Sequence, residues 1–284
     1  MSTVRVGKLQ ADWPKLMGQV TDNSNLKHVQ VYREYLAGGP WKTCVLWSFG
    51  GENGNGVLSS YDYRKSPTWS PNGEAIPYLR ELLQESFELK HLLFARLAIL
   101  SNSLLIPHRD WLEFENRPAH TRAGKRIHIP LLTNDRAFFL DENTVFHMKR
   151  GEIWVLDATR IHSAACFSEE ERIHLILDFA ETAELPDLFR FRILEPSEIP
   201  AESIYKRTPL SADELKCLQS LAQIIDMDNL QDIAAILIKK HYKKDAGEGF
   251  VWDTLLEIAS SSGNEAINSK VKRMHQEFLV QRTS

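Results

Sequence analysis

The chain has 284 residues, of which 43% are hydrophobic and 25% are charged, with a formal net charge of −4. This composition is typical of a globular protein that can bury a sizeable core, and the charge gives no basis for binding nucleic acid or an anionic membrane. No apolar run approaches the about 20 residues needed to cross a bilayer, and the sequence MSTVRVGKLQADW lacks the apolar stretch of a secretory signal, so we expect a cytoplasmic protein.

The first half of the chain predicts one helix followed by several short strands. Residues 74–89 predict the helix, because Ile76, Leu79, Leu83 and Phe87 form one apolar stripe at helical spacing. Runs typical of strands follow at residues 92–100, 125–133, 143–148, 152–157 and 172–180. Short strands in this order favour an antiparallel barrel or sandwich over a doubly wound sheet, so the fold class is mainly β with α.

The C-terminal part has a different pattern. Prolines punctuate residues 184–209 and predict a linker. Ser211 and Glu214 then have the spacing of a capping box at the start of a helix. Helical periodicity continues at residues 215–225, 230–242, 251–260 and 267–280, which predicts a small bundle of about four helices. We therefore expect a mainly β domain over residues 1–205 and a small helical domain over residues 206–284.

A histidine and an aspartate end the apolar run SLLIPHRD. Residues i and i+2 of a strand face the same side, so His108 and Asp110 point together. An imidazole and a carboxylate are two of the three ligands in the facial triad of non-haem Fe(II) sites, provided that a second histidine completes the set. The alternative is a hydrogen-bonded His–Asp pair near a turn, because an isolated His-x-Asp is common by chance.

Another histidine, His162, comes from a polar turn region, where a lone histidine is ordinarily solvated. Ten residues later Arg172 begins the strand RIHLILDFA, in which Arg172, His174, Ile176 and Asp178 share one face. The opposite face is apolar and must pack on the core. An Arg, a His and an Asp on one face are unusual for a plain barrel wall and indicate that the strand lines a site. An arginine fixed on a strand is a good bidentate partner for a carboxylate.

His-x-Asp, a distant His and then an Arg ten residues on resembles the pattern of Fe(II)/2-oxoglutarate-dependent oxygenases, which are built on a double-stranded β-helix of the jelly-roll or cupin-like type. The segments IPHRDWLEFE, KRIHIPLL, VFHMKRGEIWVLDATRIHSAACFSE and HLILDF look like the bacterial free-proline hydroxylases of the cis-3 and cis-4 types. Those enzymes belong to the aspartyl/asparaginyl hydroxylase group. The resemblance also includes VGKL near the start and SLAQIIDMDNLQDIAAILIKKHYKKD in the tail, so it covers nearly the whole chain.

The resemblance implies a role for each of several polar residues. The iron ligands fall on His108, Asp110 and His162. The clamp for the distal carboxylate of 2-oxoglutarate falls on Arg172, with further cosubstrate contacts on His128 and His147. Substrate contacts fall on Arg126, which would hold the substrate carboxylate, and on Arg96.

The implied activity is hydroxylation of a free amino acid, L-proline or a cyclic analogue such as L-pipecolate. Fe(II), 2-oxoglutarate and O2 are the implied cofactor and cosubstrates, ascorbate is the expected in vitro activator, and succinate and CO2 are by-products. The expected partner is this small molecule, with no nucleic acid and no membrane, and a homodimer is compatible with the assignment.

Two alternatives stay open at this point. One is an oxygenase that modifies Asp, Asn or Pro within a polypeptide, with the helical tail as a docking module. The other is a metal-binding isomerase or sensor, which would have no need for Arg172 at its position.

Overall fold

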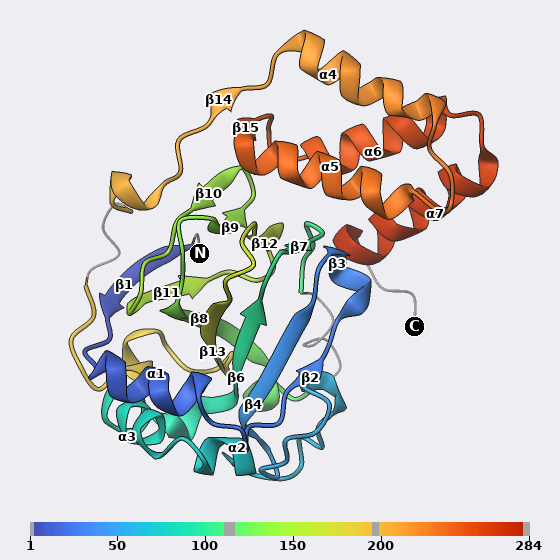
Figure 1. Cartoon of the computed structure of the whole chain (residues 1–284). Helices are drawn as coiled ribbons and strands as arrows, with labels where there is room; N and C mark the ends of the chain where they lie inside the picture. The colour runs from blue at the N-terminus through green and yellow to red at the C-terminus, as the bar shows by residue number, and fades with distance from the viewer. Residues whose placement is uncertain (1–2, 111–116, 195–198, 281–284) are drawn as a thin grey trace.

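The computed structural model describes residues 3–110, 117–194 and 199–280, and most of its strands form two sheets (Figure 1). The strands of the larger sheet are β1 (Val4–Lys8), β2 (Val29–Gln30), β4 (Trp41–Phe49), β5 (Pro67–Trp69), β6 (Leu92–Leu100), β8 (Ala123–Leu132), β11 (Glu152–Leu156) and β13 (Arg172–Ala180). Their order is β1-β11-β8-β13-β6-β4-β2, with β5 paired to β4, and the pairings are antiparallel.

The smaller sheet has five strands, also antiparallel, in the order β10-β9-β12-β7-β3. They are β3 (Leu36–Gly38), β7 (Ser103–Leu105), β9 (Ala137–Asp141), β10 (Thr144–Phe146) and β12 (His162–Cys166). A short parallel pair, β14 (Thr208–Pro209) with β15 (Lys244–Asp245), lies outside both sheets.

The helices gather in two places along the chain. The first three are α1 (Trp13–Thr21), α2 (Pro71–Glu74) and α3 (Pro77–Ser86). Four more follow the second sheet: α4 (Ala212–Gln219), α5 (Leu230–Lys243), α6 (Phe250–Ser261) and α7 (Glu265–His275). The capping box expected at the start of α4 is present, because Ser211 and Glu214 each bond the other's backbone N–H.

The predicted elements form with small differences in their bounds. β6 and β13 match the predicted ranges, and β8, β10 and β11 differ by at most two residues at either end. The predicted helix at residues 74–89 is divided: α2 ends at Glu74 and α3 begins at Pro77, where proline fixes φ and needs no N–H partner. The apolar stripe of that helix is nonetheless buried, as expected.

Three hydrophobic clusters show how these elements are layered. The first joins α1 and α3 to the outer face of the larger sheet. The second joins the smaller sheet to the C-terminal helices, and the third joins inner residues of both sheets, such as Trp154 and Phe139. The order is therefore helices, larger sheet, smaller sheet and C-terminal helices, as Figure 1 shows.

Strand alternation separates the core from the space between the sheets. Ile173, Leu175 and Leu177 of β13 point into the cluster with α1 and α3. Arg172 and Ile176, on the opposite face of the same strand, line a pocket instead. The division of this strand into an apolar and a polar face is confirmed.

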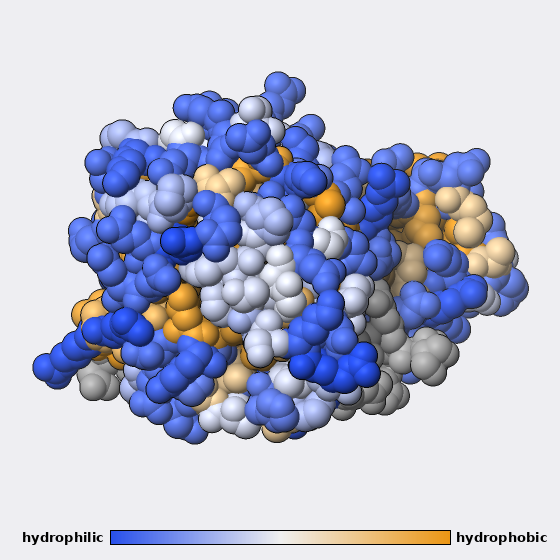
Figure 2. Space-filling view, turned by 90° about the horizontal axis from the view of Figure 1, so that it is seen from below, coloured by the Kyte–Doolittle hydropathy of each residue, from blue (hydrophilic) through white to orange (hydrophobic). Residues whose placement is uncertain are grey.

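No helix in the described ranges has the length and apolar character to cross a bilayer. The face seen from the side of α1, α2 and α3 is mostly hydrophilic, with hydrophobic side chains showing only in small patches (Figure 2).

Candidate metal centre and active-site pocket

Three possible metal ligands meet at the edge of the smaller sheet. His108 and Asp110 follow β7, and His162 is the first residue of β12. His108 and His162 form an antiparallel bridge, with N–H···O distances of 3.0 and 2.9 Å between their backbones. This bridge brings the two segments together, so that one ligand atom from each of the three side chains lies within 4.8 Å of the others.

His162 differs from the sequence expectation in its local structure. A polar turn region was expected, and a turn is present at residues 157–160, but His162 itself is buried and begins a strand. The turn ends there because β12 pairs with β9 on one side and β7 on the other.

Both imidazoles are held in the same orientation by the backbone. Nδ1 of His108 lies 2.6 Å from the carbonyl oxygen of Ile106, and Nδ1 of His162 lies 3.0 Å from that of Arg160. A neutral ring that donates from Nδ1 presents the lone pair of Nε2. The two Nε2 atoms lie 3.6 and 3.8 Å from carboxylate oxygens of Asp110. Two imidazole nitrogens and one carboxylate fit the facial triad of non-haem Fe(II).

The protonation states suit a divalent ion. Burial, and then the charge of His162, lowers the pKa of His108 to about 3, so its ring is neutral near pH 7. Burial alone would raise the pKa of Asp110, but the positive charge of Arg126, which also donates a hydrogen bond to it, outweighs burial and holds that pKa below its usual value. Metal ions bind neutral imidazole and ionised carboxylate.

Arg172 is a buried cation on the inner face of β13. Burial lowers its pKa to about 10, so it stays charged near pH 7. Its guanidinium Nη2 lies 3.0 Å from Nδ1 of His174. Among the described residues no carboxylate forms an ion pair with it. A buried arginine without a carboxylate partner is suited to binding an anionic ligand.

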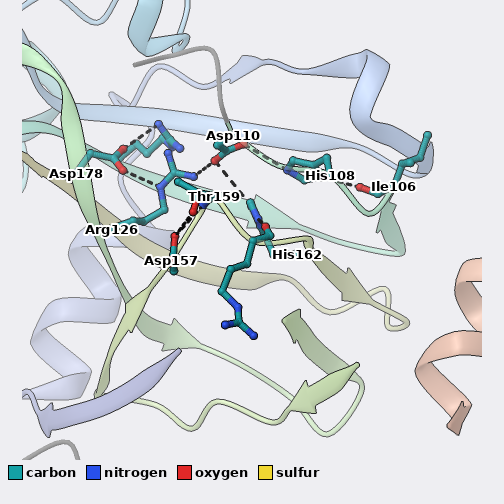
Figure 3. Close-up of polar contacts among 10 residues, drawn as sticks. Ile106, His108, Asp110, Arg126, Asp157, Thr159, His162 and Asp178 are labelled. Carbon is teal, nitrogen blue, oxygen red and sulfur yellow. Dashed lines mark hydrogen bonds and ion pairs between the residues drawn. The ribbon is translucent and has the colours of Figure 1, made fainter. Parts of the chain in front are cut away.

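A second group of charges lies beside Asp110. Arg126 donates from Nε to Asp178 at 2.7 Å and from Nη1 to Asp110, so it lies between the two carboxylates (Figure 3). Nη1 of Arg96 lies 3.4 Å from the other oxygen of Asp178. Strand pairing explains this cluster, because Asp178 stands opposite Arg126 in the register of β13 with β8.

One pocket between the sheets gathers these side chains. It is lined by His108, Asp110, His162, Arg172, Arg126, Arg96 and His128, together with apolar residues and the aromatic rings of Tyr32, Tyr35, Trp41 and Phe139. His128 is buried and neither of its ring nitrogens has a hydrogen-bond partner among the described residues. All the predicted site residues but one therefore face a common space.

The exception is His147. Its Nε2 lies 3.1 Å from the carbonyl oxygen of Asn134, its ring packs on Phe138, and it is not among the residues that line the pocket. His147 is therefore the one predicted site residue that the described pocket does not include.

The comparisons with known proteins agree with this arrangement. Residues 6–182 match the family model described as aspartyl/asparaginyl beta-hydroxylase, and residues 187–284 match that described as L-proline 3-hydroxylase, C-terminal. The chain belongs to the aspartyl/asparaginyl β-hydroxylase family. It is thus a 2-oxoglutarate-dependent dioxygenase, as the motif predicted, and its implied cofactor and cosubstrates are Fe(II), 2-oxoglutarate and O2.

Individual relatives match over almost the full length. L-proline cis-3-hydroxylase 2 from Streptomyces sp is 31% identical, covering 97% of this chain and 94% of the relative. L-proline cis-4-hydroxylase from Rhizobium meliloti (strain 1021) is also 31% identical, covering 99% of this chain and 97% of the relative.

A solved 2OG-Fe(II) oxygenase family structure from Burkholderia pseudomallei aligns with a TM-score of 0.37 at 12% identity, over 58% of this chain and 78% of that one.

The C-terminal helices of this family member reach the metal-ligand segment, which the sequence did not indicate. The indole N–H of Trp252 on α6 donates to the carbonyl of Pro107 at 2.8 Å, and the backbone N–H of Arg109 donates to the carbonyl of Phe278 at 3.0 Å. The ring of Tyr35 lies between His108 and Phe278, with centroid distances of 4.5 and 5.0 Å. The C-terminal helical segment therefore bonds the backbone of the residues before and after His108.

We expect Trp252→Phe to weaken metal binding. The variant keeps most of the ring but leaves the Pro107 carbonyl without its donor, which costs about 1–3 kcal/mol and loosens the backbone that carries His108. The dissociation constant for Mn(II), measured by calorimetry, should rise about tenfold. Trp13→Phe, which alters a half-buried ring on α1, is the matched control. Unchanged affinity in Trp252→Phe would contradict the supporting role of α6.

Buried histidines make the stability of the metal-free enzyme depend on pH. Burial is the first cause of the lowered pKa of His128 and of His174, and burial followed by the charge of Arg207 lowers the pKa of His241 to about 4. The unfolded chain takes up protons below about pH 6.5 that the folded chain does not. The free energy of unfolding should therefore be highest near neutral pH and fall as the pH drops below 6.5, by about 1.4 kcal/mol per pH unit for each such histidine.

Urea unfolding curves between pH 7 and pH 5 measure this slope. His241→Gln removes one of the groups and should make the slope shallower by one histidine. Exposed His120→Gln should leave the slope unchanged. A pH-independent midpoint for the native chain would contradict the burial argument.

Proposed function

We propose that this enzyme hydroxylates a free amino acid, L-proline or a cyclic analogue such as L-pipecolate. One C–H bond of the substrate becomes C–OH while 2-oxoglutarate and O2 are converted to succinate and CO2, so that each product takes one oxygen atom from O2. The observation that carries the proposal is the near full-length match to two L-proline hydroxylases of different regiochemistry. The buried arginines of the pocket support it, because an amino acid and 2-oxoglutarate are both carboxylates.

In this proposal His108, Asp110 and His162 hold the iron. The fit rests on the chemistry of the donor set: two imidazoles fixed by backbone carbonyls and one ionised carboxylate. When bound, the iron supplies the activation of O2 that no side chain can supply. The protein positions the reactants and keeps water away from them.

In this proposal one set of side chains binds 2-oxoglutarate and another set binds the amino-acid substrate. Arg172 receives the distal carboxylate of 2-oxoglutarate, because it is the buried arginine with no carboxylate partner among the described residues. His128, with unpartnered ring nitrogens in the described structure, faces the cosubstrate. Arg126 and Arg96 receive the substrate, and Arg126 holds its carboxylate next to Asp110 and therefore next to the iron.

The wider predictions are consistent with this function. We propose that the two sheets form a double-stranded β-helix of jelly-roll type over residues 1–205, with residues 206–284 as a helical bundle domain. The cosubstrate role of His147, the activation by ascorbate, the homodimer and the cytoplasmic location stay predictions.

A peptide oxygenase is the competing function, and free and peptide-bound substrates separate the two. Succinate release should be stimulated by L-proline or L-pipecolate and not by an N-acetylated, C-amidated proline, which lacks both charges that the pocket would recognise. Turnover of the capped compound or of a proline-containing peptide, without turnover of free amino acids, would replace the proposal by its competitor.

A further inference from the structure

His174 is a buried histidine next to the pocket that the proposed function does not use. It lies on β13 two residues after Arg172, is 2% exposed, and is not among the residues that line the pocket. Its Nδ1 lies 3.0 Å from Nη2 of Arg172. It therefore contacts the arginine without lining the pocket itself.

The chemistry of this contact fixes the tautomer of the histidine. A guanidinium only donates, so Nδ1 of His174 must accept, and the ring is neutral with its proton on Nε2. Burial and the charge of Arg172 both lower the pKa of His174, which is consistent with a neutral ring. Protonated His174 would present a second donor to Arg172 and lose the bond.

The strands on either side of His174 place no polar side chain opposite it that would compete with Arg172. Its neighbours across the larger sheet are Ala98 on β6 and Pro130 on β8, which carry no polar side-chain group. On the pocket side the ring of His128 stands edge-on at a centroid distance of 5.8 Å. The ring of His174 is thus held between Arg172 and His128.

We propose that His174 is a positioning residue that holds the guanidinium of Arg172 in the orientation needed to receive the distal carboxylate of 2-oxoglutarate. This inference rests on the proposed role of Arg172. A long arginine side chain has many rotamers, and holding it before the ligand arrives removes part of the ordering cost of binding. Nδ1 of His174 supplies the hydrogen-bond acceptor that fixes Nη2 of the Arg172 guanidinium.

Two variants separate the acceptor from the bulk of the ring. His174→Asn keeps an acceptor near the position of Nδ1 but loses volume, whereas His174→Leu keeps volume but has no acceptor. Two ligands separate the clamp from the rest of the site: 2-oxoglutarate, and 2-oxobutyrate, which has the same 2-oxo acid group but no distal carboxylate. Their dissociation constants are measured by calorimetry on Mn(II)-loaded protein, so the readout does not depend on turnover.

His174→Leu should weaken the binding of 2-oxoglutarate by about tenfold, the effect of one hydrogen bond to a charged group, and leave the binding of 2-oxobutyrate within about twofold. His174→Asn should bind 2-oxoglutarate more tightly than His174→Leu does. Equal loss for both ligands, or a better result for Leu than for Asn, would mean that the ring acts through packing and would overturn the inference.

The outcomes also separate this inference from the proposed substrate. If the native enzyme binds 2-oxoglutarate but hydroxylates no free amino acid, the proposed function fails, while the comparison of ligands still decides the role of His174. If the native, metal-loaded enzyme does not prefer 2-oxoglutarate over 2-oxobutyrate, Arg172 is no clamp and the inference fails with it.

Discussion

Asp110→Ala should abolish hydroxylation, with a fall in turnover of at least about a thousandfold, because the variant removes the only carboxylate of the candidate triad. Metal affinity should fall by more than the about 10- to 100-fold that loss of an outer-shell partner causes. The variant also leaves Arg126 beside the site without one of the two carboxylate partners that the described residues provide. Turnover is measured by succinate release and metal affinity by Mn(II) calorimetry, on the same preparation.

Asp135→Ala is the control for this variant. Asp135 is exposed on the turn before β9, so its loss should change neither constant. Circular dichroism shows whether Asp110→Ala is folded. A folded Asp110→Ala enzyme with full turnover would remove the basis of the iron assignment.

Arg126→Ala should raise the KM for the amino acid by about a hundredfold and change the KM for the cosubstrate by much less. The loss of one partner from a buried charge pair costs about 2–5 kcal/mol, and in this proposal the substrate carboxylate is the partner that depends on Arg126. Steady-state kinetics, with the amino acid and 2-oxoglutarate varied in turn, measure the two values. The reverse pattern would assign Arg126 to the cosubstrate instead.

The contact between Arg126 and Asp110 calls for a second measurement. Because Arg126 donates to a proposed metal ligand, its removal can also alter the metal site. Metal affinity should change less than the KM for the amino acid does. Arg122→Ala is the matched control, since Arg122 lies four residues away on the same segment but pairs with Glu181 at the surface. That variant should behave as the native enzyme.

Local periodicity was enough to predict β6, β8 and β13, which carry the four arginine and histidine residues of the site other than the metal ligands. The alternation of β13 was readable because its apolar and polar residues are strictly separated, and His108 and Asp110 were paired by the same two-residue rule. The unpredicted strand β12 has the short sequence HSAAC, whose small residues give little strand signal. Its position depends on pairing with β7 and β9, which no local pattern encodes.

Contacts between distant segments were beyond a reading of the sequence. Asp178 lies between Arg126 and Arg96 only because β13 is placed between β8 and β6 in the sheet. Trp252 and Pro107 are 145 residues apart, and nothing in the local pattern of the C-terminal helices indicated that α6 contacts the metal-ligand segment. Spacing rules apply within an element, whereas these contacts depend on topology.

The most direct test of the central claim is product analysis with isotopically labelled O2. The enzyme is incubated with Fe(II), 2-oxoglutarate and either L-proline or L-pipecolate, and the products are identified by mass spectrometry. The account predicts that the cyclic amino acid gains one labelled oxygen atom and that succinate gains the other, in equal amounts. Labelled succinate without any hydroxylated amino acid, for every free amino acid tried, would contradict the proposed substrate, and a product whose oxygen comes from water would contradict the proposed reaction.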